Sequence, residues 1–155
     1  MTGAGPPPLK AFGLVLHRDG HWTHEGQPVT HARMRAAFDR SVRFLPGEGV
    51  YVVQIGRFRG QIDVEDTGFF VRSFDAATGE VALSDGSCEP IDVASLRTAS
   101  SDGALLCSVK RDLVAGGLPA RFLRAAQAQL LEAVEAGPQG PRLRLQKRRA
   151  LLPPL

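Results

Sequence analysis

The apolar and polar positions near the N-terminus predict a β-hairpin. Residues 14–18 begin with an apolar run, and residues 21–25 centre on the single tryptophan, Trp22, so that both stretches have the length and composition of short strands. Asp19-Gly20 separates them, and this dipeptide favours a two-residue turn because aspartate and glycine tolerate positive φ. We therefore expect two antiparallel strands joined at Asp19-Gly20.

After Pro28 the pattern changes to that of a helix. Residues 31–45 place their apolar side chains on one side, with Thr30 as the N-cap and Pro46-Gly47 as the end. The apolar positions are Met34, Phe38, Val42 and Leu45. At about 100° per residue, three arginines fall on the opposite side: Arg33, Arg40 and Arg43.

From residue 50 the period becomes two, and turn residues separate short segments. Six strands are predicted, over residues 50–57, 61–66, 69–75, 80–84, 89–93 and 104–110. Their connections are too short for parallel crossovers, which favours an antiparallel meander. A second helix is predicted to begin at Leu118-Pro119 and to end before Gly137-Pro138.

These elements predict an α+β fold. A β-hairpin and helix pack on a six-stranded antiparallel meander with a C-terminal helix, an order superficially like that of pleckstrin-homology domains. We divide the chain into four segments: a flexible N-terminus (1–12), a hairpin-helix subdomain (13–49), a sheet-and-helix subdomain (50–136) and a basic tail rich in proline and leucine (137–155). We see no internal sequence repeat.

The charge pattern singles out the tail. The net charge is +3, but five of the 19 basic residues and none of the 16 acidic ones lie after residue 135, which leaves a net charge of −2 on the rest of the chain. Nucleic-acid or membrane binding is therefore predicted through the tail alone, as an alternative to a solubilising end or an edge strand. The tail's basic residues are Arg142, Arg144, Lys147, Arg148 and Arg149.

The rest of the composition favours a cytoplasmic protein. No apolar run approaches the roughly 20 residues that span a bilayer, and the first residues lack the features of a signal peptide. The two cysteines, Cys88 and Cys107, are too few for a disulfide framework, and we interpret them as small buried apolar residues, with a disulfide or a reactive thiol as the alternatives.

Three blocks of residues carry a family resemblance. They are Asp19-Gly20-x-Trp22 with Gly26-x-Pro28-Val29 before a helix, Ile62-x-Val64-Glu65-Asp66 before Phe69 or Phe70, and, more loosely, Leu106-x-x-Val109 through Leu113 to Phe122. With these blocks, which cover most of residues 14–135, the chain resembles the uncharacterised bacterial family called domain of unknown function 1285. The resemblance implies two related subdomains, the second superficially pleckstrin-homology-like, and a ligand site where they meet. It implies no catalytic residues. The basic tail and residues 56–59 depart from the family pattern.

The histidines do not predict a metal site. If the hairpin turn has two residues, His17, Trp22 and His24 share one face and His21 lies on the other, which leaves too few ligands on either face. Trp22 itself has two interpretations, a core anchor or the lining of a groove. We expect no metal and no cofactor.

The carboxylates of the strand predicted over residues 61–66 also have two interpretations. Asp63 and Glu65 alternate with apolar residues, as on a solvated strand, whereas Asp66 at the strand end breaks the alternation. Paired carboxylates can serve acid–base chemistry or metal binding. The arginine face of the first helix can likewise meet an anionic partner or simply face solvent.

Our leading functional hypothesis is a non-enzymatic binding or signalling module. A small ligand or a protein partner would bind at a groove between the subdomains, lined by Trp22, Arg33, Glu65 and Asp66. No nucleophile elbow, phosphate-binding loop or dinucleotide fingerprint is present in the sequence, so no catalytic residue is assigned. The alternatives are a metal-dependent hydrolase using His24 with Glu65 or Asp66, and an accessory protein that binds anionic partners through its tail.

Overall fold

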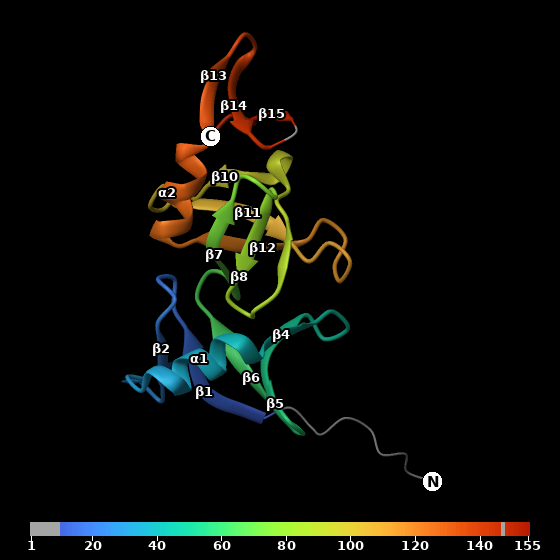
Figure 1. Cartoon of the computed structure of the whole chain (residues 1–155). Coiled ribbons are helices and arrows are strands. Elements are labelled where there is room, and N and C mark those ends of the chain that lie inside the picture. Colours follow the sequence, from blue (N-terminus) through green and yellow to red (C-terminus); the bar gives the residue numbers. More distant parts are fainter. Residues whose placement is uncertain (1–9, 147) are drawn as a thin grey trace. The chain divides into compact units, whose positions relative to one another are not determined.

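The computed structural model describes residues 10–146 and 148–155 and confirms the α+β class (Figure 1). The chain divides into two compact units, of which the first ends at Gly68 and the second begins at Phe69. The subdomain boundary predicted after residue 49 therefore falls inside the first unit, where the strands on both sides of it belong to one sheet.

The first unit is a six-stranded sheet with one helix. Its strands are ordered β3-β2-β1-β6-β5-β4, with β1 and β6 parallel and the other neighbours antiparallel. The elements are β1 (Lys10–Leu16), β2 (Trp22–His24), β3 (Gln27–Pro28), α1 (Ala32–Ser41), β4 (Val42–Leu45), β5 (Val50–Ile55) and β6 (Phe58–Val64).

The second unit repeats this arrangement and adds a small sheet. Its main sheet is ordered β10-β11-β12-β7-β8-β9, with β7 and β12 parallel. The elements of this part are β7 (Phe69–Asp75), β8 (Glu80–Leu83), β9 (Cys88–Pro90), the 3-10 turn η1 (Val93–Ser95), β10 (Arg97–Thr98), β11 (Leu105–Val109), β12 (Leu118–Phe122) and α2 (Arg124–Glu132). A three-stranded sheet follows, made of β13 (Val134–Gly137), β14 (Gly140–Arg144) and β15 (Arg149–Leu151).

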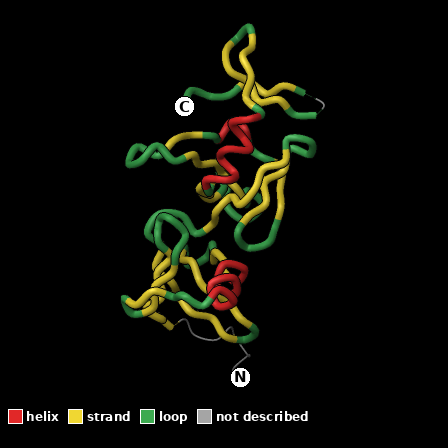
Figure 2. The backbone as a smooth tube through the Cα atoms, turned by 60° about the vertical axis from the view of Figure 1, so that its left-hand side comes forward, coloured by secondary structure: helices red, strands yellow, loops and turns green. Residues whose placement is uncertain are grey.

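The two units share one topology. Each consists of three antiparallel strands, a helical segment and three more antiparallel strands, and in each the first and last strands pair in parallel at the centre of the sheet. The red helices in Figure 2 are not equivalent in this topology, because α1 lies between the two sets of strands, whereas α2 follows the last strand of the second main sheet. The predicted single antiparallel meander is therefore wrong. Alternation identifies a strand and its buried face but not its partner, so the central parallel pairs left no local signal.

Both predicted helices include residues that form strands in the structure. α1 ends at Ser41, and Val42–Leu45 forms β4, because Val42 pairs with Val53 and Phe44 packs edge-on against Tyr51. Similarly, Leu118–Phe122 forms β12, and α2 begins only at Arg124. In both cases apolar residues that fit a helical stripe are held in a sheet by tertiary pairing, which overrides local propensity.

Each unit has its own core. In the first unit the largest fully buried side chains are Leu16, Trp22, Val42, Val52 and Val53. The corresponding list in the second unit is Phe69, Val71, Val81, Leu83, Val109, Leu130 and Leu143. Full burial of such side chains contributes roughly 1.5–3 kcal/mol each.

The two cysteines have different environments. Cys107 is fully buried, as interpreted from the sequence, and burial raises the pKa of its thiol to about 12. Cys88, in the edge strand β9, is exposed, so the burial expected for it from the sequence is wrong. Within the described residues no helix is long and apolar enough to cross a membrane.

Replacing Gly68 with alanine should destabilise the protein. A Cβ at this position would lie 2.2 Å from Cε1 of Tyr51, whose ring packs against Phe44. Overpacking of this kind lowers the free energy of unfolding by about 1–3 kcal/mol, which urea unfolding would measure. Gly47→Ala is the control, because its Cβ would meet no atom within 4 Å. Equal unfolding midpoints for the two variants would contradict the packing of Tyr51 on Gly68.

Candidate functional site

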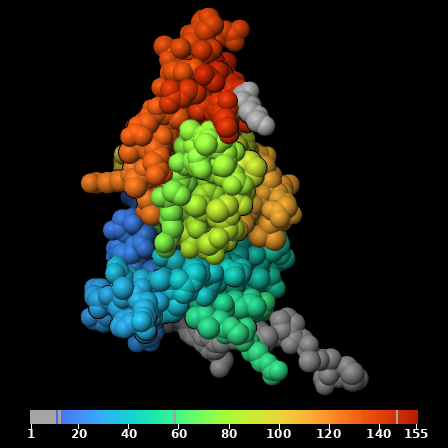
Figure 3. Space-filling view, in the orientation of Figure 1, coloured from blue at the N-terminus to red at the C-terminus, as the bar shows by residue number. Residues whose placement is uncertain are grey.

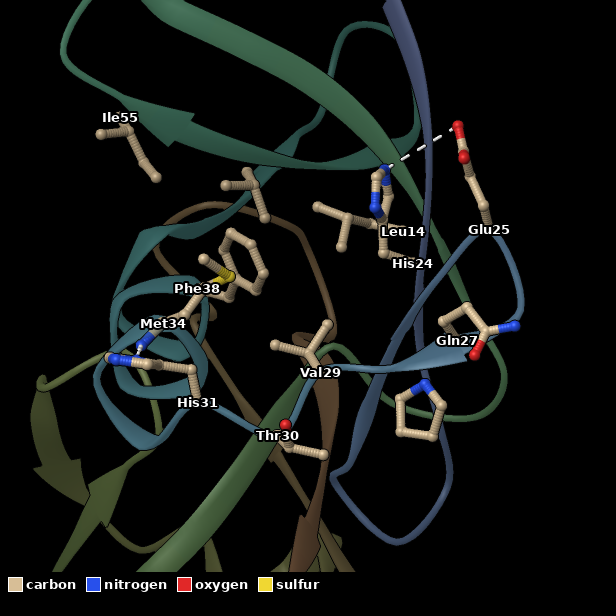
Figure 4. Close-up of a pocket in the computed structure, with 12 residues that line it drawn as sticks. Leu14, His24, Glu25, Gln27, Val29, Thr30, His31, Met34, Phe38 and Ile55 are labelled. Atoms are coloured by element: carbon tan, nitrogen blue, oxygen red, sulfur yellow. Dashed lines mark hydrogen bonds and ion pairs between the residues drawn. The ribbon is translucent and has the colours of Figure 1, made fainter.

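A hollow in the first unit lies beside α1, and we call it the α1 cavity (Figure 4). Its volume is about 680 Å³, within the range of roughly 300–1,000 Å³ that holds small molecules. Most of its lining is apolar, with polar groups at the rim. The lining residues are Leu14, His24, Glu25, Gln27, Pro28, Val29, Thr30, His31, Met34, Phe38, Val53 and Ile55.

The sheet register places the cavity on the face that α1 covers. Leu14 pairs with His24 across β1 and β2, so both side chains project to the same face. Val53 and Ile55 are two residues apart on β5, so their side chains point to the same face, and both line the cavity. The space-filling view shows the stretch around α1, in light blue to cyan, at the surface of the first unit (Figure 3).

α1 covers this face incompletely. None of its residues is fully buried, and Met34 is 49% exposed although it belongs to the apolar side predicted from the sequence. Ile55, at the end of β5, is 46% exposed. Large apolar side chains are thus left accessible at the α1 cavity, where a bound group could cover them.

Trp22 packs behind the lining residue Phe38 and does not line the cavity itself. The indole is 1% exposed, its Nε1 donates a hydrogen bond to Asp39 Oδ1 at 2.8 Å, and its ring lies 5.4 Å from that of Phe38. Both Phe38 and Asp39 belong to α1. The groove-lining interpretation of Trp22 is corrected: a buried indole with a satisfied N–H anchors the helix to the sheet, and Phe38 presents the surface.

A bulge and a tight turn fix the polar end of the cavity. The β2–β3 turn consists of Glu25 and Gly26, both with positive φ (51° and 81°), and Glu25 N donates to the carbonyl of Gly13 at 2.9 Å. Gly13 lies in an irregular part of β1 with φ of 69°, and a Cβ there would come within 3.0 Å of Glu25 Cγ. This packing holds His24 and Glu25 at the rim, with His24 Nε2 4.0 Å from Glu25 Oε1.

The remaining hairpin histidines form a separate cluster. The β1–β2 turn contains three residues and not two, because His17 N donates to the carbonyl of His21 and Gly20 N donates to the carbonyl of His17. Gly20 has φ of 93°, as a three-residue turn with a bulge requires. The predicted register is therefore wrong by one residue, and Leu16, not His17, pairs with Trp22.

The shifted register stacks His17 on His21. The two rings lie 4.2 Å apart at an interplanar angle of 5°. His17 Nδ1 is 2.9 Å from Glu65 Oε2 and its Nε2 is 2.8 Å from Thr23 Oγ1, while His21 Nδ1 bonds to the carboxylate of Asp19. The hydrogen bond from His17 lowers the pKa of Glu65, and that from His21 lowers the pKa of Asp19.

This arrangement separates the residues that the sequence analysis grouped. Glu65 contacts His17, not His24, and neither Glu65 nor Asp66 lines the α1 cavity. Arg33 is exposed on α1 beside the lining residue Met34. Within the described parts of the chain, no three histidine, cysteine or acidic side chains are placed so that they could hold a metal ion.

The basic tail is built into the second unit's three-stranded sheet. Glu135 Oε1 accepts hydrogen bonds from Nε of Arg149 (2.6 Å) and of Arg142 (2.9 Å), which together lower its pKa. Arg144 and Arg148 are exposed, and Lys147 lies outside the described residues. Two of the five basic groups are thus paired internally, and binding of an anionic partner through the tail stays a prediction.

Two solved structures have the same fold as this chain. A DUF1285 family protein from Silicibacter pomeroyi DSS-3 superposes with a TM-score of 0.62, over 97% of this chain and 90% of that one. The resemblance to the DUF1285 family is confirmed. A DUF1285 family protein from Shewanella baltica OS155 gives a TM-score of 0.54, over 77% of this chain and 91% of that one.

Each of these DUF1285 proteins is 18% identical to this chain, so the likeness establishes the DUF1285 fold and no shared activity. Comparison with protein-family models gives no match. Comparison with curated proteins also gives none.

Trp22→Phe should destabilise the protein markedly. The change removes the indole N–H that bonds to Asp39 and leaves a smaller ring, so we expect the free energy of unfolding to fall by about 2–4 kcal/mol in a urea titration. Asp39→Asn keeps an acceptor oxygen and should cost only about 1 kcal/mol. A Trp22→Phe variant as stable as the parent would show that the indole does not anchor α1.

Glu65→Gln should make the free energy of unfolding fall less steeply as the pH is lowered below about 4.5. The pKa of Glu65 is lowered in the folded state, so its contribution is complete above the ordinary glutamate pKa of about 4.5 and is lost as the pH falls below it. Urea midpoints measured from pH 7 to pH 3 should therefore fall less steeply in this variant. His17→Ala, which removes the donor, should flatten the same region. Parallel curves for all three proteins would rule out the His17–Glu65 interaction in solution.

Proposed function

We propose that this chain is a non-enzymatic binding module whose first unit receives the apolar part of a small ligand or of a protein partner in the α1 cavity. The observation that carries this proposal is a cavity of about 680 Å³ at which Met34 and Ile55 remain about half exposed. The binding role expected from the sequence is retained, and its site is assigned to residues of the first unit.

The geometry favours binding of an apolar group. Burial of apolar surface contributes about 25 cal/mol per Å², so covering the two exposed side chains and the surrounding wall yields a useful affinity without any charged contact. The rim then supplies orientation, since Gln27 and Thr30 offer hydrogen-bonding groups next to the apolar floor. Arg33 stays a proposed contact residue, because it neighbours Met34 on the exposed surface of α1.

The helix arrangement also suits a binding site that adjusts to its occupant. α1 is attached to the sheet mainly near its C-terminal half, through the contacts of Phe38 and Asp39 with Trp22. Its first turn, which carries Met34, has only exposed residues. Such weakly packed segments move at low free-energy cost, which is typical of ligand-binding elements.

Met34→Asp should weaken the binding of a neutral apolar probe. Nile red is a suitable probe, with binding followed by its own fluorescence. A carboxylate at the cavity mouth must be desolvated when the dye binds, so we expect affinity to fall about tenfold or more. The fold should survive, because an aspartate in the first turn of a helix is favourable.

Leu131→Asp is the matched control. Leu131 is 56% exposed on α2, similar to Met34 on α1, but it lies outside the cavity lining. Nile red affinity should be unchanged in this variant, and circular dichroism should show both variants folded. Equal affinities of the parent, Met34→Asp and Leu131→Asp proteins would exclude the α1 cavity as the binding site.

A further inference from the structure

We infer that the ligand of the α1 cavity is an amphipathic anion, with an apolar chain inside the cavity and a carboxylate or similar acidic head group at the rim. This inference rests on the proposed binding function and adds the charge of the ligand. It follows from the side chains around the cavity and from a comparison of the two units.

The exposed start of α1 is basic. Arg33 and Arg35 are the chain neighbours of the lining residue Met34, about 100° to either side of it around the helix, and both are exposed. Neither lines the cavity itself, so they would reach a head group only where it extends past the rim. The first turn contains no acidic residue, and the structure gives neither guanidinium an ion-pair partner among the described residues. Basic groups at a helix N-terminus oppose the helix dipole, and an anion bound between them would offset that cost.

His31 adds a hydrogen-bond donor at the same end. It is the N-cap of α1, and its Nδ1 accepts the N–H of Met34 at 3.4 Å. When the ring is neutral its proton must therefore lie on Nε2, which can donate. His31 itself lines the cavity, so a head group at the rim is within reach of this donor.

Few acidic groups lie around the cavity. Among the lining residues Glu25 is the single carboxylate, and it lies 4.0 Å from His24, a second ring that can donate. The backbone N–H of Glu25 donates to the carbonyl of Gly13. The groups around the cavity thus complement a negative head group better than a positive one.

The second unit shows that the shared topology does not require this opening. In the equivalent hairpin, β11–β12, Val109 occupies the strand end that Ile55 occupies in β5–β6. Val109 is 1% exposed, whereas Ile55 is 46% exposed. The same framework is closed in one unit and open in the other, so the accessible apolar floor is a property of the first unit's own sequence.

The test compares three probes that share one alkyl chain and differ in head-group charge: octanoate, octanol and octylammonium. Calorimetric titration of the full chain at low ionic strength should give the tightest binding for octanoate, about five- to thirtyfold tighter than for octylammonium, with octanol between them. Raising the salt concentration should reduce the difference, since exposed charges are screened.

Variants separate the charge from the cavity. Arg33→Gln with Arg35→Gln should remove most of the preference for octanoate and leave octanol binding unchanged. Arg40→Gln is the control, because Arg40 is an exposed arginine in the last turn of the same helix, two turns from Arg33 and away from His31 and Met34. It should bind all three probes as the parent does.

The possible outcomes test the anionic ligand, the two arginines and the cavity separately. Equal affinity for the three probes, or a preference for octylammonium, would overturn the anionic ligand while leaving the cavity as an apolar binding site. Preference for octanoate that persists in the double variant would overturn the assignment of Arg33 and Arg35 to the head group. Binding of none of the probes would overturn both this inference and the proposed function.

Discussion

Both units of this protein are closed by a parallel pairing between the strand that begins the unit and the strand that ends it. β1 pairs with β6 and β7 pairs with β12, and every other neighbouring pair within the two main sheets is an antiparallel pair of consecutive strands. Without the central pair each unit would be two separate three-stranded meanders, which are marginal on their own. The pairing joins them into one continuous sheet. The helical segment of each unit lies between the two meanders in the chain.

The two units use that common plan differently. In the second unit the corresponding strands are closed to solvent, with Cys107, Val109 and Ala120 almost completely buried. In the first unit α1 is held by the indole of Trp22 and covers the face only in part. One unit thus provides a closed core, and the other provides a hollow whose floor is apolar and whose rim is polar. The proposed binding site is a consequence of incomplete coverage of a sheet that can be covered completely.

Local signals in the sequence were sufficient for the class of fold and for several elements. The α+β class and the strand over residues 69–75 were predicted as observed, because alternation and turn residues are local properties. The end of α1 and the identity of residues 118–122 were not, because their apolar residues satisfy a helical and a strand pattern equally. The shared topology of the two units was implied only by the family resemblance, and the central parallel pairs could not be predicted from local pattern, since their partners lie about fifty residues apart.

The candidate site was predictable only in fragments. Met34 and Phe38 were placed on the apolar side of a helix, but their exposure could not be read from a pattern that assumes a fully covered face. The hairpin register was shifted by one residue because Gly20 closes a three-residue turn, and that single shift moved His17 away from Trp22 and next to His21. Turn geometry at one glycine therefore decided which histidines meet, as the period of two in a strand requires.

The central parallel pairs also determine when, during synthesis, each unit can become complete. A chain emerging from the ribosome exposes β1 first and β6 last, so the middle of the sheet cannot form until the whole unit has been translated. Until then β1 and β4–β5 present unpaired edges, the segments most prone to pair with other chains. In the second unit β7 likewise has no parallel partner until β12 has been translated. The time taken to translate residues 17–64 and 76–122 thus sets how long each unit remains open to misassembly.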